Sequence, residues 1–168
     1  MSPASPDQAT PVTVRIGELR VLKGRGVLAA IGLGSCVGVA LYDPVSRVAG
    51  LAHIFLPSSQ NGRLVAGAPA RYADTGVPAL VDAMVAAGAR RERLQAKLVG
   101  GAQLFLRGDH ATLEVGRRNV EAVRAALCAL GIRVVAQDVG GSRGRTMRLF
   151  AETGRVVVTT LGSEAREL

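Results

Sequence analysis

The chain has 168 residues, of which 48% are hydrophobic and 3% aromatic, and its formal net charge is +8. This apolar content excludes a disordered chain and suits one domain with a core of small aliphatic side chains. No apolar run reaches the roughly 18 residues of a membrane-spanning helix, and Cys36 and Cys128 are too few for a disulfide framework. We therefore expect a cytoplasmic protein with free thiols and no membrane insertion.

The positive charge raises the question of an acidic partner. Nearly all of the basic residues are arginine, and they are spread along the chain rather than clustered. A protein that stacks on nucleic-acid bases would interleave aromatic side chains with its basic residues, and this chain has few. The sequence therefore argues against base stacking but not against phosphate contact. It leaves three explanations for the charge: an acidic protein surface, nucleic-acid phosphates, which we expect less, or an arginine-rich genomic composition.

Residues 1–11 are rich in Pro and Ser and predict a flexible tail, so that 12–168 form a single domain. Runs rich in β-branched residues predict strands from residue 12 to about residue 57. Helical spacing of apolar residues predicts one helix that begins at Asp74 or Thr75 and ends at Gly88, and a second over 117–130. The later strand-like runs are 93–105, 132–141, 146–152 and 155–161. Strands mixed with two helices indicate an α/β (α+β) sandwich.

The stretch "GLGSCVGVALYDPVSRVAGLAHIFLP", residues 32–57, contains the candidate chemistry. Asp43 and Pro44 predict a type I turn between two strands. If the connecting loop is 43–46, the two strands pair so that Cys36 lies directly opposite His53. A thiol and an imidazole at that separation can hydrogen-bond.

Such a pair suits nucleophilic catalysis. A neighbouring imidazolium lowers the pKa of a thiol from about 8.5 and can later protonate a leaving amine. Gly34 and Ser35 would form the site loop, and a backbone N–H there could stabilise an oxyanion. Cysteine and histidine also occur as inert core residues, so the residues alone leave both interpretations open. Two side chains are too few for a zinc site, and we expect no metal ion or cofactor.

The same residues resemble the CheD family of chemoreceptor glutamine deamidases. "LGSCVGVALYDP" is followed by "GLAHIFLP", with His53 seventeen residues after Cys36. The resemblance continues through "RYADTGVPALVDAM", "KLVGGAQLF", "GRRNVEAV", "DVGGSRGRTMRL" and "ETGRVVV", and so covers nearly the whole chain.

The resemblance implies a cytoplasmic enzyme of bacterial chemotaxis adaptation that hydrolyses glutamine side chains of chemoreceptors to glutamate and ammonia. Cys36 would be the nucleophile that forms a thioester, and His53 the general base and acid. The implied fold is a three-layer sandwich of mixed, largely antiparallel sheets with two main helices. A CheC-type phosphatase is the implied second partner, and Phe105 would belong to the partner surface.

One position departs from the family pattern. The third member of the family's catalytic triad is a Thr six residues before the Cys, and here that residue is Ala30. Ala30 has no hydroxyl to orient the imidazole, so a main-chain carbonyl or another group must do so, or activity is weak. The departure keeps an alternative open, in which the chain is a CheD-like adaptor that binds chemoreceptors or CheC with little or no catalysis.

Overall fold

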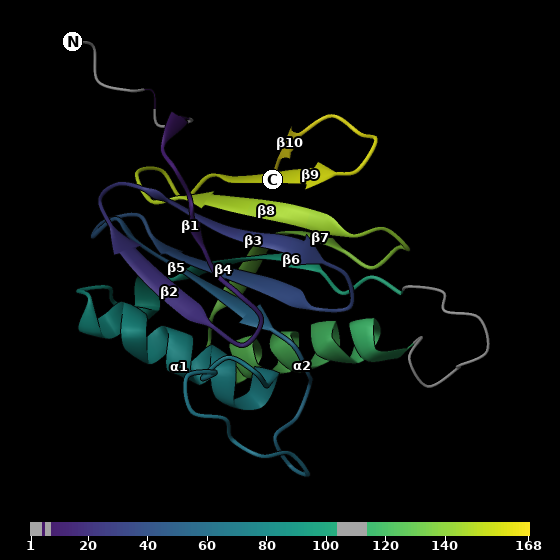
Figure 1. The fold of residues 1–168 in the computed structure, drawn as a ribbon. Helices are drawn as coiled ribbons and strands as arrows, with labels where there is room; N and C mark the ends of the chain where they lie inside the picture. Colours follow the sequence, from purple (N-terminus) through teal and green to yellow (C-terminus); the bar gives the residue numbers. More distant parts are fainter. Residues whose placement is uncertain (1–4, 6–7, 104–113) are drawn as a thin grey trace.

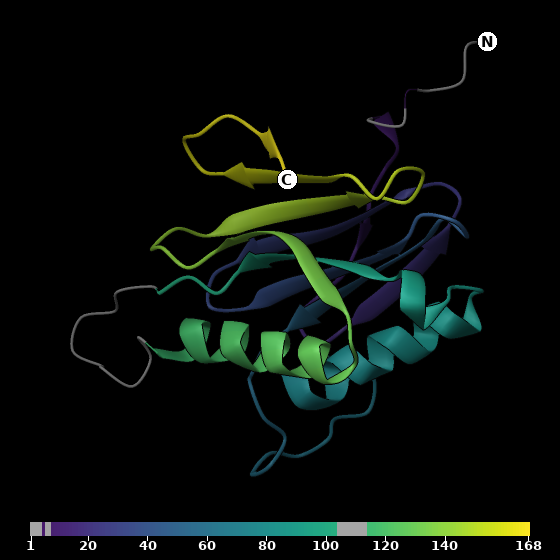
Figure 2. The same ribbon diagram turned by 180° about the vertical axis from the view of Figure 1, so that it is seen from behind.

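Two β-sheets and a layer of helices are stacked in the computed structural model, which describes residues 5, 8–103 and 114–168. Figure 1 shows one sheet above the second, with both long helices on the far face of the second sheet, and Figure 2 shows the same stacking from behind. This confirms the three-layer α+β sandwich. Phe105, expected at the partner surface, lies outside the described residues.

The described residues form ten strands in two mixed sheets. The first sheet has the order β1-β3-β8-β9-β10 and consists of β1 (Val12–Thr13), β3 (Val27–Leu33), β8 (Arg145–Phe150), β9 (Val156–Thr160) and β10 (Arg166–Glu167). The second has the order β2-β5-β4-β6-β7 and consists of β2 (Leu19–Lys23), β5 (Val48–Ile54), β4 (Val37–Asp43), β6 (Gln95–Gly100) and β7 (Arg133–Val139). The parallel pairs among these strands are β1–β3 and β6–β7.

The helices are α1 (Ala73–Ala86) and α2 (Val115–Ala129), with the short 3-10 helix η2 (Arg91–Arg93) before β6. Both helices begin slightly earlier than the sequence predicts, and the predicted N-cap of α1 is wrong. Tyr72 occupies the cap position without a side-chain hydrogen bond. Asp74 instead accepts hydrogen bonds from the backbone N–H and hydroxyl of Ser59. Gly88 and Gly131 follow the helices with positive φ, as predicted.

Strands β4 and β5 are buried on both faces. Their alternate residues therefore enter two different cores. Leu41 and Ile54 pack toward the helices, whereas Ala40 and Leu51 pack into the layer between the two sheets. Because side chains alternate along a strand, His53 shares the inter-sheet face with Leu51. Cys36 belongs to the same inter-sheet core.

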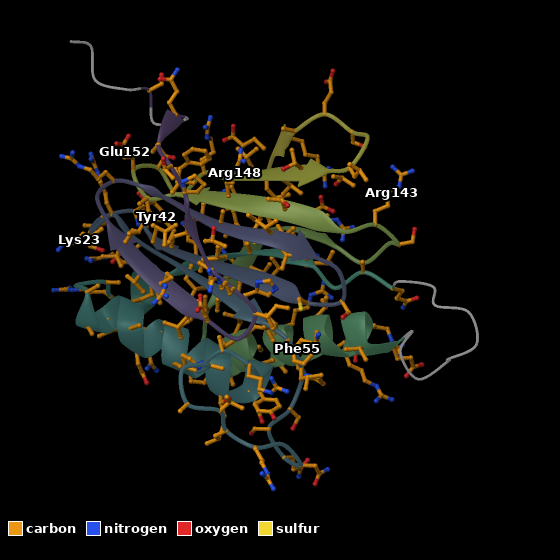
Figure 3. The ribbon with its side chains drawn as sticks, in the orientation of Figure 1. Lys23, Tyr42, Phe55, Arg143, Arg148 and Glu152 are labelled. Carbon is orange, nitrogen blue, oxygen red and sulfur yellow. The ribbon has the colours of Figure 1, made fainter. Side chains whose placement is uncertain are left out.

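The predicted register of the β4–β5 hairpin is wrong by one pair. Asp43, predicted to lie in the loop, instead pairs with Val48 as the last residue of β4. The four-residue loop is therefore 44–47 rather than 43–46. The displaced loop sets Gly38, not Cys36, directly opposite His53. Moving the loop by one residue changes each partner by two residues, which leaves every side chain on its predicted face. Figure 3 shows Tyr42 and Phe55 near opposite ends of this strand pair.

Candidate active site

A bulge at the end of β3 leads into the loop that carries Cys36. The pairing of β3 with β8 is regular as far as Ala30 and resumes, shifted, at Leu33. The two residues between them are Ile31, which is 59% exposed, and Gly32, whose φ is 69°. A bulge bends its strand and changes the direction of the chain beyond it. Here the bend takes the chain from the first sheet into the second, where β4 begins one residue after Cys36.

The segment that leaves β6 fixes the Cys36 loop through main-chain hydrogen bonds. Gly101 N–H donates to Cys36 O over 2.8 Å, and Ala102 N–H donates to Gly34 O over 2.8 Å. Gly100 has a φ of 113°, and a Cβ atom at that residue would collide with Cys36 O. The backbone can approach the Cys36 loop so closely only because residue 100 is a glycine.

Asn119 on α2 also holds this loop, and sequence reasoning missed it. Its buried side chain donates from Nδ2 to Ser35 O over 2.9 Å and to Phe55 O over 3.0 Å. One signal could have revealed it, since Asn119 lies at i and i+4 spacing with Val123 on the apolar face of α2. A polar side chain on a buried helical face requires hydrogen-bond partners.

His53 lies almost fully buried, at 2% exposure, at the end of β5. Its Nδ1 is 3.0 Å from Val14 O. A carbonyl oxygen only accepts, so Nδ1 carries the hydrogen, and Nε2 of the neutral ring carries the lone pair. Nε2 has no hydrogen-bond partner within the described part of the chain. The imidazole is thus held in the tautomer that suits a general base.

Cys36 and His53 lie on the inter-sheet side of the hairpin without being directly opposed. The strand ladder ends with Val37 opposite Ile54, and one further pair would set Cys36 opposite Phe55 and diagonal to His53. Diagonal neighbours across antiparallel strands are about 7–8 Å apart, within reach of longer side chains. No hydrogen bond joins Cys36 Sγ to His53 Nε2 among the described residues. Catalytic hydrogen bonds of this kind often form only once the substrate is bound.

Burial favours the neutral form of both side chains. It raises the pKa of the Cys36 thiol above its usual value, and the backbone N–H of Cys36 offsets this only in part. It also lowers the pKa of His53, against smaller opposing effects of the Val14 carbonyl and Glu18. The arrangement therefore differs from the imidazolium and thiolate that the sequence suggested. A neutral thiol lies near a neutral imidazole whose Nε2 can accept the proton.

The structure also answers what orients His53 when position 30 is an alanine. Ala30 is fully buried in the inter-sheet core and pairs with Met147 of β8. The acceptor for His53 Nδ1–H is Val14 O, just after β1, and Val14 N–H in turn donates to Ala29 O over 2.8 Å. A main-chain carbonyl thus holds the imidazole of His53, at a position where the family resemblance implies a threonine hydroxyl.

Other kinds of site find little support in the described residues. They contain no group of three or more His, Cys, Asp or Glu side chains that could hold a metal ion. None of the described helices combines the length and apolar character needed to cross a membrane. Cys128, the second cysteine, is exposed on α2.

Comparison with known proteins identifies the family. The sequence model described as "CheD chemotactic sensory transduction" matches residues 55–160. Two proteins named "Probable chemoreceptor glutamine deamidase CheD" are similar to the chain. The protein from Symbiobacterium thermophilum is 54% identical over 157 residues, which cover 92% of this chain and 95% of the relative. The protein from Archaeoglobus fulgidus is 49% identical over 147 residues, 88% of this chain and 91% of the relative.

A third relative bears the same name without the qualifier. "Chemoreceptor glutamine deamidase CheD" of Halalkalibacterium halodurans is 43% identical over 158 residues, which cover 94% of this chain and 98% of the relative. The similarity to the relatives covers nearly the whole chain, whereas the family model begins at Phe55, just after β5, and ends with β9. The chain therefore belongs to the CheD family.

Proposed function

We propose that the chain is a chemoreceptor glutamine deamidase, which hydrolyses glutamine side-chain amides to glutamate and ammonia through a thioester on Cys36. The observation that carries the proposal is the state of His53. Its Nδ1–H donates to Val14 O, and its Nε2, which has no partner among the residues that the structure describes, lies on the same face as Cys36. The names of the relatives supply the substrate class.

The first step makes the thioester. As Cys36 Sγ attacks the amide carbon, His53 Nε2 takes the thiol proton and the carbonyl oxygen becomes an oxyanion. We assign the backbone N–H of Cys36, which adjoins the thiol, as the donor to that oxyanion. The protonated Nε2 then gives its proton to the amide nitrogen, the C–N bond breaks, and ammonia leaves.

The second step hydrolyses the thioester. Water attacks the acyl carbon while Nε2, now neutral again, takes a proton from it. The second oxyanion collapses, the C–S bond breaks, and the thiolate of Cys36 recovers its proton from the imidazolium. The net reaction consumes one water for each amide, and both residues return to their neutral starting state.

The wider setting is proposed on the same grounds. A net charge of +8 would attract an acidic receptor segment and speed its association. We propose a cytoplasmic location and a CheC-type phosphatase as second partner, as the family resemblance implies. The low aromatic content argues against nucleic acid as a target.

A second candidate function is a CheD-like adaptor that binds receptors or CheC without turnover. Two observations favour it. Cys36 is only 7% exposed, and its thiol does not hydrogen-bond to His53 within the described residues. An adaptor would not need a hydrogen bond between Cys36 and His53.

Incubation of the purified protein with a chemoreceptor fragment tests both functions, with Gln-to-Glu conversion followed by peptide mass spectrometry. We expect conversion by the wild type, none by Cys36→Ala, and full conversion by Cys128→Ala, which removes the exposed second cysteine. Equal conversion by wild type and Cys36→Ala would show that the nucleophile is wrong. Receptor binding without conversion by the wild type would favour the adaptor.

A further inference from the structure

We infer that Asn119 is a positioning residue of the deamidation reaction, which fixes the backbone N–H of Cys36 and the distance between the Cys36 loop and the His53 strand. This inference rests on the proposed function and adds a residue to it. Asn119 does not touch the reacting atoms. It acts through the two carbonyl groups that its side chain binds.

The position of Asn119 in the fold supports the inference. The hydrogen-bonded pairs of β4 and β5 end with Val37 and Ile54. Beyond that pair, Nδ2 of Asn119 joins Ser35 O and Phe55 O, at 2.9 Å and 3.0 Å. Figure 3 shows Phe55 at this end of the sheet, beside α2. The amide therefore bridges the two strands where they cease to pair, next to Cys36 and two residues from His53.

Peptide geometry carries the effect from Asn119 to the reaction. Ser35 C=O and Cys36 N–H belong to one planar trans peptide group, so they point in opposite directions. Because Asn119 holds Ser35 O toward α2, Cys36 N–H must point away from the helix. That N–H is the donor assigned to the oxyanion, and its direction decides whether it can stabilise the charge.

The helix that carries Asn119 is itself fixed to the loop. Gly116, in the first turn of α2, packs so closely on the backbone of Gly101 and Ala102 that a Cβ atom there would collide with it. Gly101 and Ala102 are the residues whose N–H groups bind Cys36 O and Gly34 O. The Cys36 loop is thus held by the Asn119 side chain and by the backbone of Gly101 and Ala102, and Gly116 packs that backbone against α2.

One polar atom of the Asn119 side chain is left without a partner in the described part of the chain. Ser35 O and Phe55 O are both acceptors, so the NH2 group must lie between them, and Oδ1 is left buried with no partner in the described residues. Burying a carbonyl oxygen without a donor costs stability. An apolar side chain of similar size would avoid that cost, but it would leave Ser35 O and Phe55 O without this donor and could not orient the Ser35 peptide.

The test compares Asn119→Leu and Asn119→Ala with Val123→Ala. Leu is close to Asn in size and lacks both donor and unpartnered acceptor, and Ala provides a second variant in case Leu distorts the loop. Val123 is buried on the same face of α2 one turn further on, so its truncation weakens packing without touching either carbonyl. Each variant is measured for kcat and KM of deamidation, for thermal unfolding, and for the rate at which iodoacetamide alkylates Cys36.

We expect both Asn119 variants to lose about 100-fold in kcat, the loss typical when an oxyanion donor is removed, with KM within about threefold. Alkylation needs the thiol but no oxyanion donor, so its rate should stay within about threefold of wild type. Val123→Ala should leave kcat within about threefold at a similar or larger loss of thermal stability.

Three outcomes would overturn the inference. In the first, kcat of the folded Asn119 variants equals that of Val123→Ala. In the second, alkylation falls in parallel with kcat, which would mean that the loop has collapsed and Asn119 is only structural. In the third, the wild type itself gives no conversion, and then the proposed function fails as well, which separates that failure from the other two.

Discussion

The buried Asp43 carboxylate at one end of β4 is fully hydrogen-bonded, whereas buried polar side chains at the other end are only partly hydrogen-bonded within the described residues. At one end, both oxygens of the fully buried Asp43 accept hydrogen bonds, from the Arg93 guanidinium at 2.8–3.0 Å and from the N–H groups of Arg90 and Val45. At the other end, His53 Nε2 and Asn119 Oδ1 are buried without partners among the described residues. The polar cluster around Asp43 thus stabilises one end of β4, whereas the candidate site at the other end contains polar atoms that make no hydrogen bond within the described residues.

The difference extends to the electrostatics of the two ends. Burial alone would raise the pKa of Asp43, but the hydrogen bonds from Arg93 and Arg90 hold it well below its usual range. Asp43 is therefore a charge compensated by fixed donors. Cys36 and His53, in contrast, are both driven toward neutrality by burial. A charge compensated by fixed donors, as at Asp43, stabilises the fold. A neutral thiol beside a neutral imidazole can instead transfer its proton when a substrate binds.

Removing the proposed base, His53, should give the largest difference between the effect on rate and the effect on stability. His53→Gln deletes the imidazole, so we expect kcat of deamidation to fall by about 10³-fold, within the range of general acid–base catalysis. Stability should change by only about 1 kcal/mol, because the one hydrogen bond of the ring that is lost goes to Val14 O. Steady-state kinetics and chemical denaturation check both expectations. A large loss of stability together with a small loss of rate would mean that His53 stabilises the fold and does not act as the base.

The reciprocal change removes the charge at the stabilising end. Asp43→Asn leaves the buried face of Arg93 without its carboxylate, and breaking a buried ion pair in this way costs about 3 kcal/mol. We expect that loss in the free energy of unfolding in urea, while kcat per folded molecule stays within about twofold of wild type. Glu92→Gln, at an exposed residue next to Arg93, is the matched control and should be neutral. A large drop in kcat for folded Asp43→Asn would mean that the two ends are coupled.

The dependence of the reaction on pH sharpens the contrast in charge state. The pKa of His53 is lowered from its usual value of about 6.5, mainly by burial, so Nε2 loses its capacity to accept a proton only below that pH. The pKa of Cys36 is raised, so the thiol keeps its proton beyond the usual thiol range. We expect kcat/KM to be flat from about pH 6.5 to 8.5 and to fall about tenfold per pH unit in acid. A rate that climbs steadily between about pH 7 and 9 would instead require a preformed thiolate.

The smallest expected effect concerns position 30. Ala30→Thr restores the hydroxyl of the family pattern, but His53 Nδ1–H already donates to Val14 O. We expect the rate to change by less than about threefold, while the added atoms cost about 1 kcal/mol in the packed inter-sheet core. Ala40→Thr, the same substitution elsewhere in that core, is the control. A large rise in rate for Ala30→Thr alone would show that the Val14 carbonyl is a poor orienting group.

The elements of the fold could be predicted from the sequence because their signals are local. Helical spacing and terminal glycines located α1 and α2, and β-branched runs located most strands. The layer arrangement was expected only from the family resemblance, since periodicity does not say which strands pair. The hairpin register was missed by one pair because Asp43 both pairs in β4 and accepts the turn N–H groups of Val45 and Ser46.

The site was predictable to the extent that it consists of side chains. Cys36 and His53 stood out as rare residue types at suggestive spacing, and the two-residue periodicity of strands kept them on one face despite the register error. Asn119 left a readable signal on the apolar face of α2. The Val14 acceptor left none, because every residue has a carbonyl group and only the path of the chain decides where it points.

The hydrogen bond from His53 to Val14 O has an evolutionary consequence. A side-chain partner can be deleted by one codon change, whereas a peptide carbonyl survives any substitution that preserves the backbone. The imidazole therefore needs no hydroxyl at residue 30, and its orientation depends instead on whatever keeps the segment around Val14 against β3. Alignment columns would record Ala30 as a lost triad member, although the imidazole is still held.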